Sequence, residues 1–204
     1  MLSDLKLGQP VVVALIAILI CLLLFRPRNN QQQTRRAAAS AASTPKKLPT
    51  TSISTTGTLL QIEAGKVALI PDAVAALLRI ARYVDVYLIT TLPEDSDALE
   101  AAVMEALASA GIFVDGSCER CKALFCSTED GRGAIVRQLG SALHIDCSAK
   151  VLQYLAPHLP RVVHVQSAGH GGGAQVGGAV VASSLAVYVE AHLRATATTA
   201  PAQA

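Results

Sequence analysis

Short apolar runs alternate with longer amphipathic stretches from residue 59 to residue 195. In the stretch PDAVAALLRIARY (71–83), apolar residues recur at the spacing of one helix face. Runs such as DVYLITTL (85–92) have the length and the β-branched content of strands. The pattern predicts strands at 59–62, 66–70, 85–92, 122–128, 142–147 and 161–166, and helices at 71–83, 96–111, 129–140, 148–159 and 183–195.

This alternation predicts an α/β fold. Successive parallel strands need a crossover connection, which a helix supplies, so repeats of this kind favour a mostly parallel sheet with helices on both faces. We expect a Rossmann-like, doubly wound domain over residues 59–195. Within it, Ser96 should cap the second helix and Gly111 should end it.

The run Val11 to Phe25, VVVALIAILICLLLF, predicts one N-terminal transmembrane helix. Alone it spans about 22 Å as a helix, and the residues back to Leu5 supply the missing turns. A cleavable signal peptide would need a small-residue site directly after the run, but Arg26-Pro27-Arg28 follows it. A core helix would not precede a long polar stretch. We therefore expect residues 1–25 to form a membrane anchor that contacts the lipid bilayer through Val11 to Phe25.

The polar, proline-containing stretch 26–58 predicts a basic, disordered tether, because it has too few apolar residues to offset chain entropy. Residues 196–204 are expected to form a disordered tail. The basic residues beside the apolar run indicate that everything after it stays in the cytosol, by the positive-inside rule.

Charge is distributed unevenly, although the formal net charge is only +2. No acid lies between Asp4 and Glu63, whereas acids outnumber Lys and Arg from Glu63 onward. A basic neck on a mildly acidic domain argues against a nucleic-acid-binding protein.

Ligands of doubly wound sheets bind at the carboxyl ends of the strands, so catalytic or ligand-binding residues are expected there. A phosphatase of the haloacid dehalogenase type needs a carboxylate nucleophile after its first strand, an acid two residues on, and a downstream Lys. The run LLQIEAG offers only Glu63, without a second acid, while Thr90, Thr91 and Lys122 match only the outline of the rest. We expect no such active site.

Two further motifs are weak. GHGGGA (169–174) fits the G-x-G-x-x-[GA] pattern of dinucleotide-binding loops, but it lies in the last strand–helix unit, and Glu190 falls within a helical pattern. It is typical of a flexible linker. Cys118 and Cys121 form a lone C-x-x-C pair. Cys126, His144 and Cys147 do not supply the second pair of a zinc site, so we expect reduced cysteines and no metal.

The segment from Cys126 to Arg132, CSTEDGR, follows a predicted strand and opens a predicted helix. Either Ser127 or Thr128 suits the N-cap position, and Asp130 favours a helix N-terminus. No phosphate-binding Lys follows, and no His is paired with Ser127. We therefore predict a capped turn in which Cys126, Ser127, Asp130 and Arg132 are not catalytic.

The stretch LFCSTEDGRGAIVRQLGSALHID (124–146) nevertheless resembles the plant-type peroxisome biogenesis protein 22 family. The resemblance spans roughly residues 74 to 165, through RIARYVDVYLI, ALASAGIF and VVHV, and is weaker at SSLAVYVE. The glycine-rich HGGGAQVGGAVVA departs from the family pattern.

The resemblance implies a Rossmann-like cytosolic domain held on the peroxisomal membrane by a single span. Members of the family recruit and support the peroxisomal ubiquitin-conjugating enzyme, which monoubiquitinates the import receptor for matrix proteins so that the receptor is recycled. The expectation is a protein that is not an enzyme, with that conjugating enzyme as partner and with no cofactor or small-molecule ligand. The alternative is a membrane-tethered α/β hydrolase or nucleotide-binding protein that uses CSTEDGR and GHGGGA.

Overall fold

The computed structural model describes residues 48–114, 117–166 and 176–199. The predicted span Val11–Phe25, most of the tether and the GHGGGA motif lie outside the described residues. Within the described ranges, every helix is too short or too polar to cross a bilayer.

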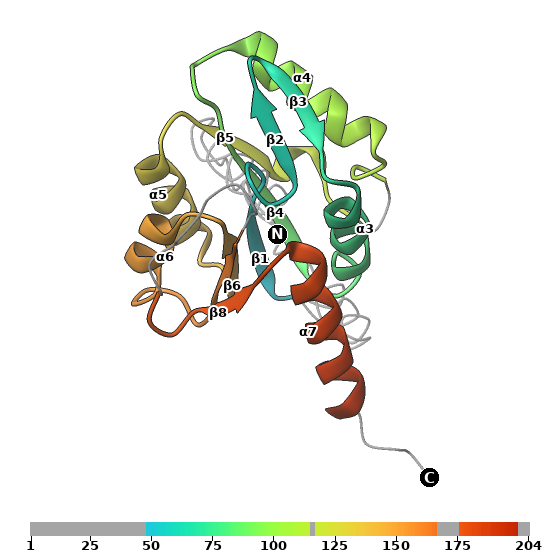
Figure 1. The fold of residues 1–204 in the computed structure, drawn as a ribbon, viewed down its shortest axis with the longest axis vertical. Coiled ribbons are helices and arrows are strands. Elements are labelled where there is room, and N and C mark those ends of the chain that lie inside the picture. Colours follow the sequence, from blue (N-terminus) through green and yellow to red (C-terminus); the bar gives the residue numbers. More distant parts are fainter. Residues whose placement is uncertain (1–47, 115–116, 167–175, 200–204) are drawn as a thin grey trace, which may run out of the picture. The chain divides into compact units, whose positions relative to one another are not determined.

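Six parallel strands form the main sheet, in the order β5-β4-β1-β6-β7-β8 (Figure 1). The central strand β1 pairs with β4 on one side and β6 on the other. The strands are β1 (Thr50–Ser54), β4 (Asp85–Thr91), β5 (Ala123–Cys126), β6 (Leu143–Asp146), β7 (Val162–Val165) and β8 (Val180–Ala182). The parallel sheet and its helical crossovers confirm the predicted Rossmann-like α/β fold.

Helices cover both faces of this sheet, and Figure 1 shows α5 and α6 on one side and α3 and α7 on the other. The helices are α3 (Pro71–Ile80), α4 (Asp97–Ser109), α5 (Glu129–Leu139), α6 (Ala149–Leu155) and α7 (Leu185–Thr199), and a short 3₁₀ turn, η1 (Arg120–Lys122), precedes β5. The larger apolar core lies under α3, α4 and α7, and a smaller one lies under α5 and α6. The crossover helices therefore lie on both faces of the sheet, as in a doubly wound fold.

A separate antiparallel hairpin follows β1 directly. It consists of β2 (Leu60–Glu63) and β3 (Lys66–Leu69), joined by Ala64 and Gly65, which both have positive φ. Both strands were predicted, but they pair with each other instead of joining the main sheet.

The central strand β1 lies in residues predicted to be disordered tether, so the prediction that the tether continues to residue 58 is wrong. The strand was missed because Ile53 is its one large apolar residue. The side chains of Thr51, Ser52 and Ser54 are nevertheless buried. A core accommodates a small hydroxyl group most readily where the hydroxyl finds a partner. Ser52, for example, lies beside His144 of β6, with 2.9 Å between Oγ and Nδ1.

Two boundaries at the other end also differ from the predictions. Strand β8 forms within the stretch that follows the glycine-rich motif, where no strand was predicted. Helix α7 continues to Thr199, so a disordered tail beginning at residue 196 is also wrong.

The described chain enters and leaves the domain at the same end of the sheet. Leu48 precedes β1, at the amino end of that strand. Helix α7 follows β8 and packs antiparallel to the sheet strands against α3, where Arg79 near the end of α3 pairs with Glu190. In Figure 1 the far end of α7 points away from the β2–β3 hairpin, which lies beyond the carboxyl ends of the strands.

Candidate functional site

The carboxyl ends of β1, β4 and β6 surround a pocket of about 510 Å³. Its lining includes Thr56 after β1, Ile62 of the hairpin, Thr91 at the end of β4, Glu129 and Arg132 of α5, and Ser148 before α6. This is the position at which open α/β sheets bind their ligands. The pocket is therefore the candidate functional site.

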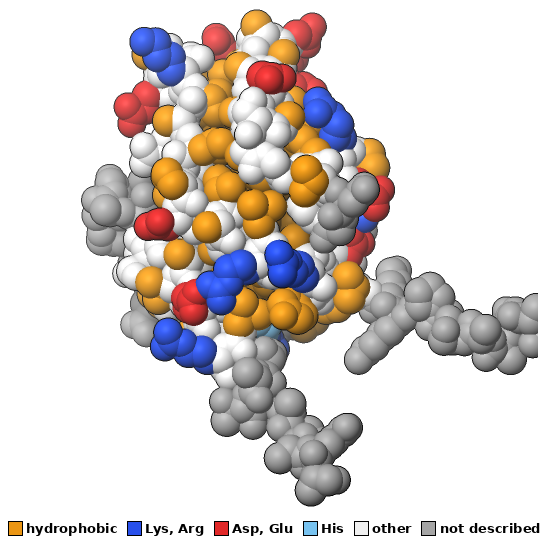
Figure 2. Space-filling view, turned by 90° about the vertical axis from the view of Figure 1, so that its right-hand side faces the viewer, with side chains coloured by type: hydrophobic (Ala, Val, Ile, Leu, Met, Phe, Trp, Pro, Cys, Tyr) orange, Lys and Arg blue, Asp and Glu red, His pale blue; other side chains and the backbone are white. Residues whose placement is uncertain are grey.

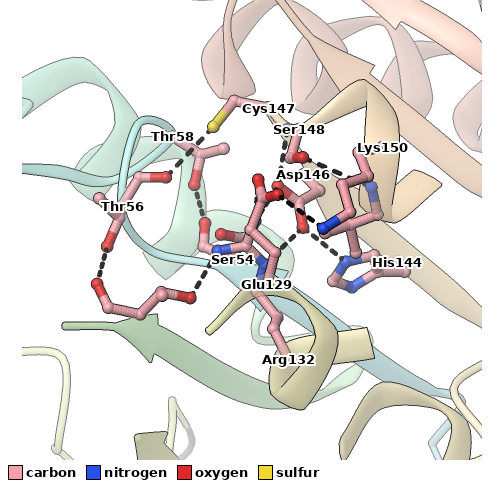
Figure 3. Close-up of polar contacts among 12 residues, drawn as sticks. Ser54, Thr56, Thr58, Glu129, Arg132, His144, Asp146, Cys147, Ser148 and Lys150 are labelled. Atoms are coloured by element: carbon pink, nitrogen blue, oxygen red, sulfur yellow. Dashed lines mark hydrogen bonds and ion pairs between the residues drawn. The ribbon is translucent and has the colours of Figure 1, made fainter. Parts of the chain in front are cut away.

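A tight turn follows β1 and forms one wall of the pocket (Figure 3). The backbone N–H groups of Thr58, Leu59 and Leu60 all donate to the carbonyl oxygen of Thr55, and the Thr58 hydroxyl donates to the carbonyl of Ser54. Gly57 has a φ of +82°, and a Cβ at this position would lie 2.5 Å from the Cys147 sulfur. Only glycine meets both requirements.

Asp146 ends β6 and is completely buried. Arg132 Nε lies 2.9 Å and His144 Nε2 3.1 Å from its Oδ2, while the backbone N–H of Ser148 donates to Oδ1 at 2.9 Å. Arg132 also donates to Oδ1 through its terminal nitrogen at 3.3 Å. Burial alone would raise the pKa of this carboxyl, but His144, Arg132 and the Ser148 N–H outweigh it, so the pKa lies below its ordinary value. Asp146 is therefore held as a carboxylate.

Arg132 supplies the positive charge of the site and is only 4% exposed. Helix α5 positions it: Thr128 caps the helix by accepting from the N–H of Gly131 at 3.0 Å, and Arg132 follows in the first turn. Its guanidinium donates to the Thr91 hydroxyl at 2.5 Å as well as to Asp146. Since β1 lies between β4 and β6, the guanidinium bridges the two strands that flank the end of β1.

Charged residues at the rim pair with one another above Arg132. Lys150 lies 2.9 Å from Asp130 and 3.7 Å from Glu129, and Glu129 lies 3.7 Å from Arg132. The three acids and two bases of this cluster, Asp146 included, leave no excess of positive charge for an incoming anion.

Ser52, His144 and Asp146 form a row of contacts that has the outline of a hydrolytic Ser-His-Asp triad. All three residues are completely buried in the middle of the sheet. A nucleophile must reach its substrate, so these contacts are structural and join β1 to β6.

The structure separates the residues that the sequence singled out. Thr91, Ser127 and Arg132 line the pocket, while the Cys126 sulfur lies 3.4 Å from the Thr91 hydroxyl. Thr90 is turned inward and contacts the Thr55 hydroxyl at 2.7 Å. Lys122 is at the opposite end of the sheet, bound to Asp85 at 2.7 Å and Glu119 at 2.8 Å. Glu63 is exposed on the hairpin and does not line the pocket.

The cysteine pair gives no metal site in the described part of the chain, where no three His, Cys, Asp or Glu side chains are grouped suitably for a metal. Cys118 is buried and Cys121 is exposed. Burial raises the pKa of the Cys118 thiol to about 11, and burial together with the Asp146 charge raises that of Cys147 to about 11. Both thiols are therefore protonated and unreactive near neutral pH.

Two positions of the site, Ser54 and Thr56, were not predicted from the sequence. The first strand of the fold is β1, so the nucleophile position of a haloacid dehalogenase-type phosphatase falls on Ser54, and the acid two residues on falls on Thr56. The signal was the run Ser54-Thr-Thr-Gly-Thr58 before Leu59, a glycine turn directly after a β-branched stretch. It was overlooked because neither key position carries an acid.

Comparison with solved structures shows the fold. D,D-heptose 1,7-bisphosphate phosphatase from B. bronchiseptica, complexed with magnesium and phosphate, superposes with a TM-score of 0.53 at 18% identity, over 72% of this chain and 99% of the phosphatase. The corresponding phosphatase from Burkholderia thailandensis gives a TM-score of 0.54 at 16% identity, over 71% and 98% of the two chains. At these identities the likeness extends to the architecture alone.

Sequence comparison is more specific. Peroxisome biogenesis protein 22 of Arabidopsis thaliana is 42% identical over 89 residues, which is 44% of this chain but only 31% of the relative. Residues 58–188 match the family model described as peroxisome biogenesis protein 22, haloacid dehydrogenase-like domain. Because this match covers more than half of the chain, the chain belongs to the peroxisome biogenesis protein 22 family.

Proposed function

We propose that this protein is a peroxisomal membrane anchor that recruits and supports a ubiquitin-conjugating enzyme. The recruited enzyme would monoubiquitinate the import receptor for matrix proteins, which allows the receptor to be recycled. Membership of the family implies a role in peroxisome biogenesis. The recruitment step, the partner and the attachment to the membrane are our proposals.

The observation that carries a non-enzymatic role is the pair Ser54 and Thr56 at the end of β1. A phosphatase of this fold needs a carboxylate nucleophile at the first position and an acid at the second. The Ser54 hydroxyl is completely buried and has no hydrogen-bond partner, and Thr56 is used in the turn, where its hydroxyl donates to the carbonyl of Thr91 at 3.2 Å. Neither residue can take over the role of an acid.

The fold also implies a divalent cation, since one phosphatase of this architecture was crystallised with magnesium and phosphate. Magnesium is held by several oxygen ligands, usually including carboxylates. Of the nearby carboxylates, Asp146 at the end of β6 is completely buried with the guanidinium of Arg132 against it. Glu129 lines the pocket but is paired with Arg132 and Lys150. The residues present do not fit a divalent cation.

Recruitment needs only a folded surface held near the site of action. A tether from residue 26 to 47 would let the domain sample a shell of about 25 Å around its attachment point. Tethering can raise the local concentration of a bound partner to about the millimolar range. The face over α3 and α7 carries hydrophobic side chains interspersed with charged ones (Figure 2), a composition that interfaces share with ordinary protein surfaces.

Calorimetry with the purified conjugating enzyme tests the proposal. The chain from Leu48 onward should associate with the enzyme at about tens of micromolar or below, and a conjugating enzyme without its catalytic cysteine should bind equally well. Recruitment requires no chemistry, so this second measurement separates docking from transfer. Absence of binding heat at these concentrations would end the recruitment proposal.

The alternative, a hydrolase or nucleotide-binding protein, is favoured by one observation, the pocket of about 510 Å³ at the strand ends. Thermal unfolding with nucleotides and sugar phosphates distinguishes the two. A ligand present at about 100 times its Kd should stabilise the domain by about 2.7 kcal/mol. We expect no such shift.

A further inference from the structure

The floor of the pocket already contains a fixed positive charge. The guanidinium of Arg132 is nearly inaccessible and contacts the ends of both β4 and β6 through Thr91 and Asp146. Figure 3 shows it extending from α5 toward Asp146, beside the turn that follows Ser54. A cation with ligands at the ends of β1, β4 and β6 would have to occupy this same volume.

The carboxylate oxygens of Asp146 are already closely surrounded by nitrogen atoms. A carboxylate offers about four lone-pair positions, two on each oxygen. Four groups lie within 3.3 Å of these oxygens: two guanidinium nitrogens of Arg132, the ring nitrogen of His144 and the backbone N–H of Ser148. A metal ion could reach Asp146 only by displacing Arg132.

We propose that Arg132 is a built-in replacement for the divalent cation of this fold. Two separate features then exclude a metal: the neutral side chains at Ser54 and Thr56, and the guanidinium bound to Asp146. The second feature acts independently of the first. Restoring the acids of β1 would therefore not restore metal binding while Arg132 remains.

The replacement has a structural consequence. A buried carboxylate without a counter-charge is strongly unfavourable, so a protein that loses its metal must neutralise Asp146 in another way. Arginine suits this task better than lysine, because its planar group has five donors and contacts Thr91 and both oxygens of Asp146 at once. The ends of β4 and β6 are thus held together, on either side of β1, without any exchangeable ion.

Manganese binding to the full chain, purified in mild detergent and stripped of metal, tests the proposal directly. Electron paramagnetic resonance counts free Mn²⁺. The natural chain and a Ser54→Asp/Thr56→Asp variant should both show no Mn²⁺ binding at Asp146. Asp146→Asn, made in each background, is the matched control: any binding that it leaves unchanged is not at Asp146. Adding Arg132→Ala to the double variant should produce binding at least about tenfold tighter. If the double variant already binds as tightly as the triple variant, missing acids alone exclude the metal and the proposal is wrong.

Stability gives a second, independent readout. The melting temperature of the natural chain and of Arg132→Lys should be the same in EDTA and in Mn²⁺. Arg132→Met should melt lower than both and should be stabilised by Mn²⁺, an effect that Asp146→Asn abolishes. A folded Arg132→Met variant that ignores Mn²⁺ would overturn the proposal. If this variant does not fold in EDTA, refolding in Mn²⁺ supports the proposal, and failure to refold in Mn²⁺ counts against it. Neither readout involves the conjugating enzyme, so the outcome is separate from that of the recruitment proposal.

Discussion

At the scale of single residues, the cap of α5 is Thr128, whose hydroxyl accepts from the N–H of Gly131 at 3.0 Å. The sequence allowed either Ser127 or Thr128 in this role, and the structure selects the second. Thr128→Ala should lower the free energy of unfolding by about 1 kcal/mol, because one backbone N–H loses its partner. Urea denaturation followed by circular dichroism measures this.

Ser127→Ala is the matched control, since Ser127 is the adjacent residue and also carries a hydroxyl at the pocket. Its effect should stay within about 0.5 kcal/mol. Equal losses from the two variants would show that the cap is not the source of the stability.

Asp146 should make the domain sensitive to acid. Burial raises the pKa of this carboxyl, but His144 and Arg132 lower it by more, so its pKa in the folded protein lies below the ordinary value of 3.8. A lowered folded pKa gives stability that is present above the unfolded value and is lost as the pH falls through the folded one. The urea concentration at the unfolding midpoint, measured from neutral pH to acid, should therefore decrease once the pH is below about 4.

The Asp146→Asn variant tests whether this carboxyl causes the loss of stability in acid. The variant should be less stable at neutral pH by about 3 to 5 kcal/mol, since Arg132 loses its partner, and its acid dependence should be shallower. Parallel pH profiles for the two proteins would assign the acid sensitivity to other carboxyls.

At the scale of secondary-structure elements, β1 makes a sharp prediction. It pairs with both β4 and β6, so it is the centre of the sheet. A chain that begins at residue 58 lacks this strand and should fail to fold, whereas a chain that begins at Leu48 should give a dispersed NMR spectrum. The chain that begins at residue 58 would leave the facing edges of β4 and β6 unpaired and an unfilled space between them. A well-dispersed spectrum from the shorter chain would contradict the central role of β1.

Sequence patterns identified the long, periodic elements well. The predicted helix 96–111 corresponds to α4 at Asp97–Ser109, with Ser96 accepting from the N–H of Leu99 as expected for a cap. The predicted strand 85–92 corresponds to β4. Both have enough apolar residues at one spacing to define a buried face. Strand β1 has one large apolar residue, Ile53, and its other buried side chains are those of small hydroxyl residues, which do not mark a strand in the sequence.

The contacts of the candidate site could not be predicted from the sequence, because they join residues that are distant along the chain. Arg132 and Asp146 were both visible in the resembling stretch, but their contact depends on α5 folding back beside β6. The Lys122 side chain lies at the amino end of the sheet, although its position in the sequence suggested the pocket. Which end of the sheet a residue reaches depends on strand boundaries, and a shift of a few residues changes the answer.

At the scale of the whole molecule, we predict an integral membrane protein whose anchor is Val11–Phe25. Carbonate extraction of organelles should leave the chain in the pellet, and protease added to intact organelles should remove the domain. Replacing Leu15 and Leu19 by Arg should cost about 5 kcal/mol or more of insertion and release the protein. Valine at the same two positions is the control and should keep it in the pellet. Release of the unaltered chain by carbonate would contradict the anchor.

The recruitment proposal also predicts that the anchor is interchangeable. An unrelated peroxisomal span fused to residues 48–204 should restore receptor recycling in cells that lack the protein, while 48–204 alone should bind the enzyme but not restore recycling. The difference arises because only the fused form confines the partner to the membrane. Imaging against a peroxisomal marker verifies where each form resides. Full restoration by the unanchored form would show that confinement is unnecessary.

Because the described chain enters at Leu48 and α7 ends at the same side of the sheet, either terminus can serve as a handle without covering the pocket. A domain coupled to a sensor surface through its first or its last residues would present Arg132 and the hairpin outward. A partner that docks at the pocket would then be held a full domain length from the point of coupling, and one that docks near Lys122 would sit directly beside it. Cross-linkers of graded length, attached at the coupling point, would therefore read out which end of the sheet a partner occupies.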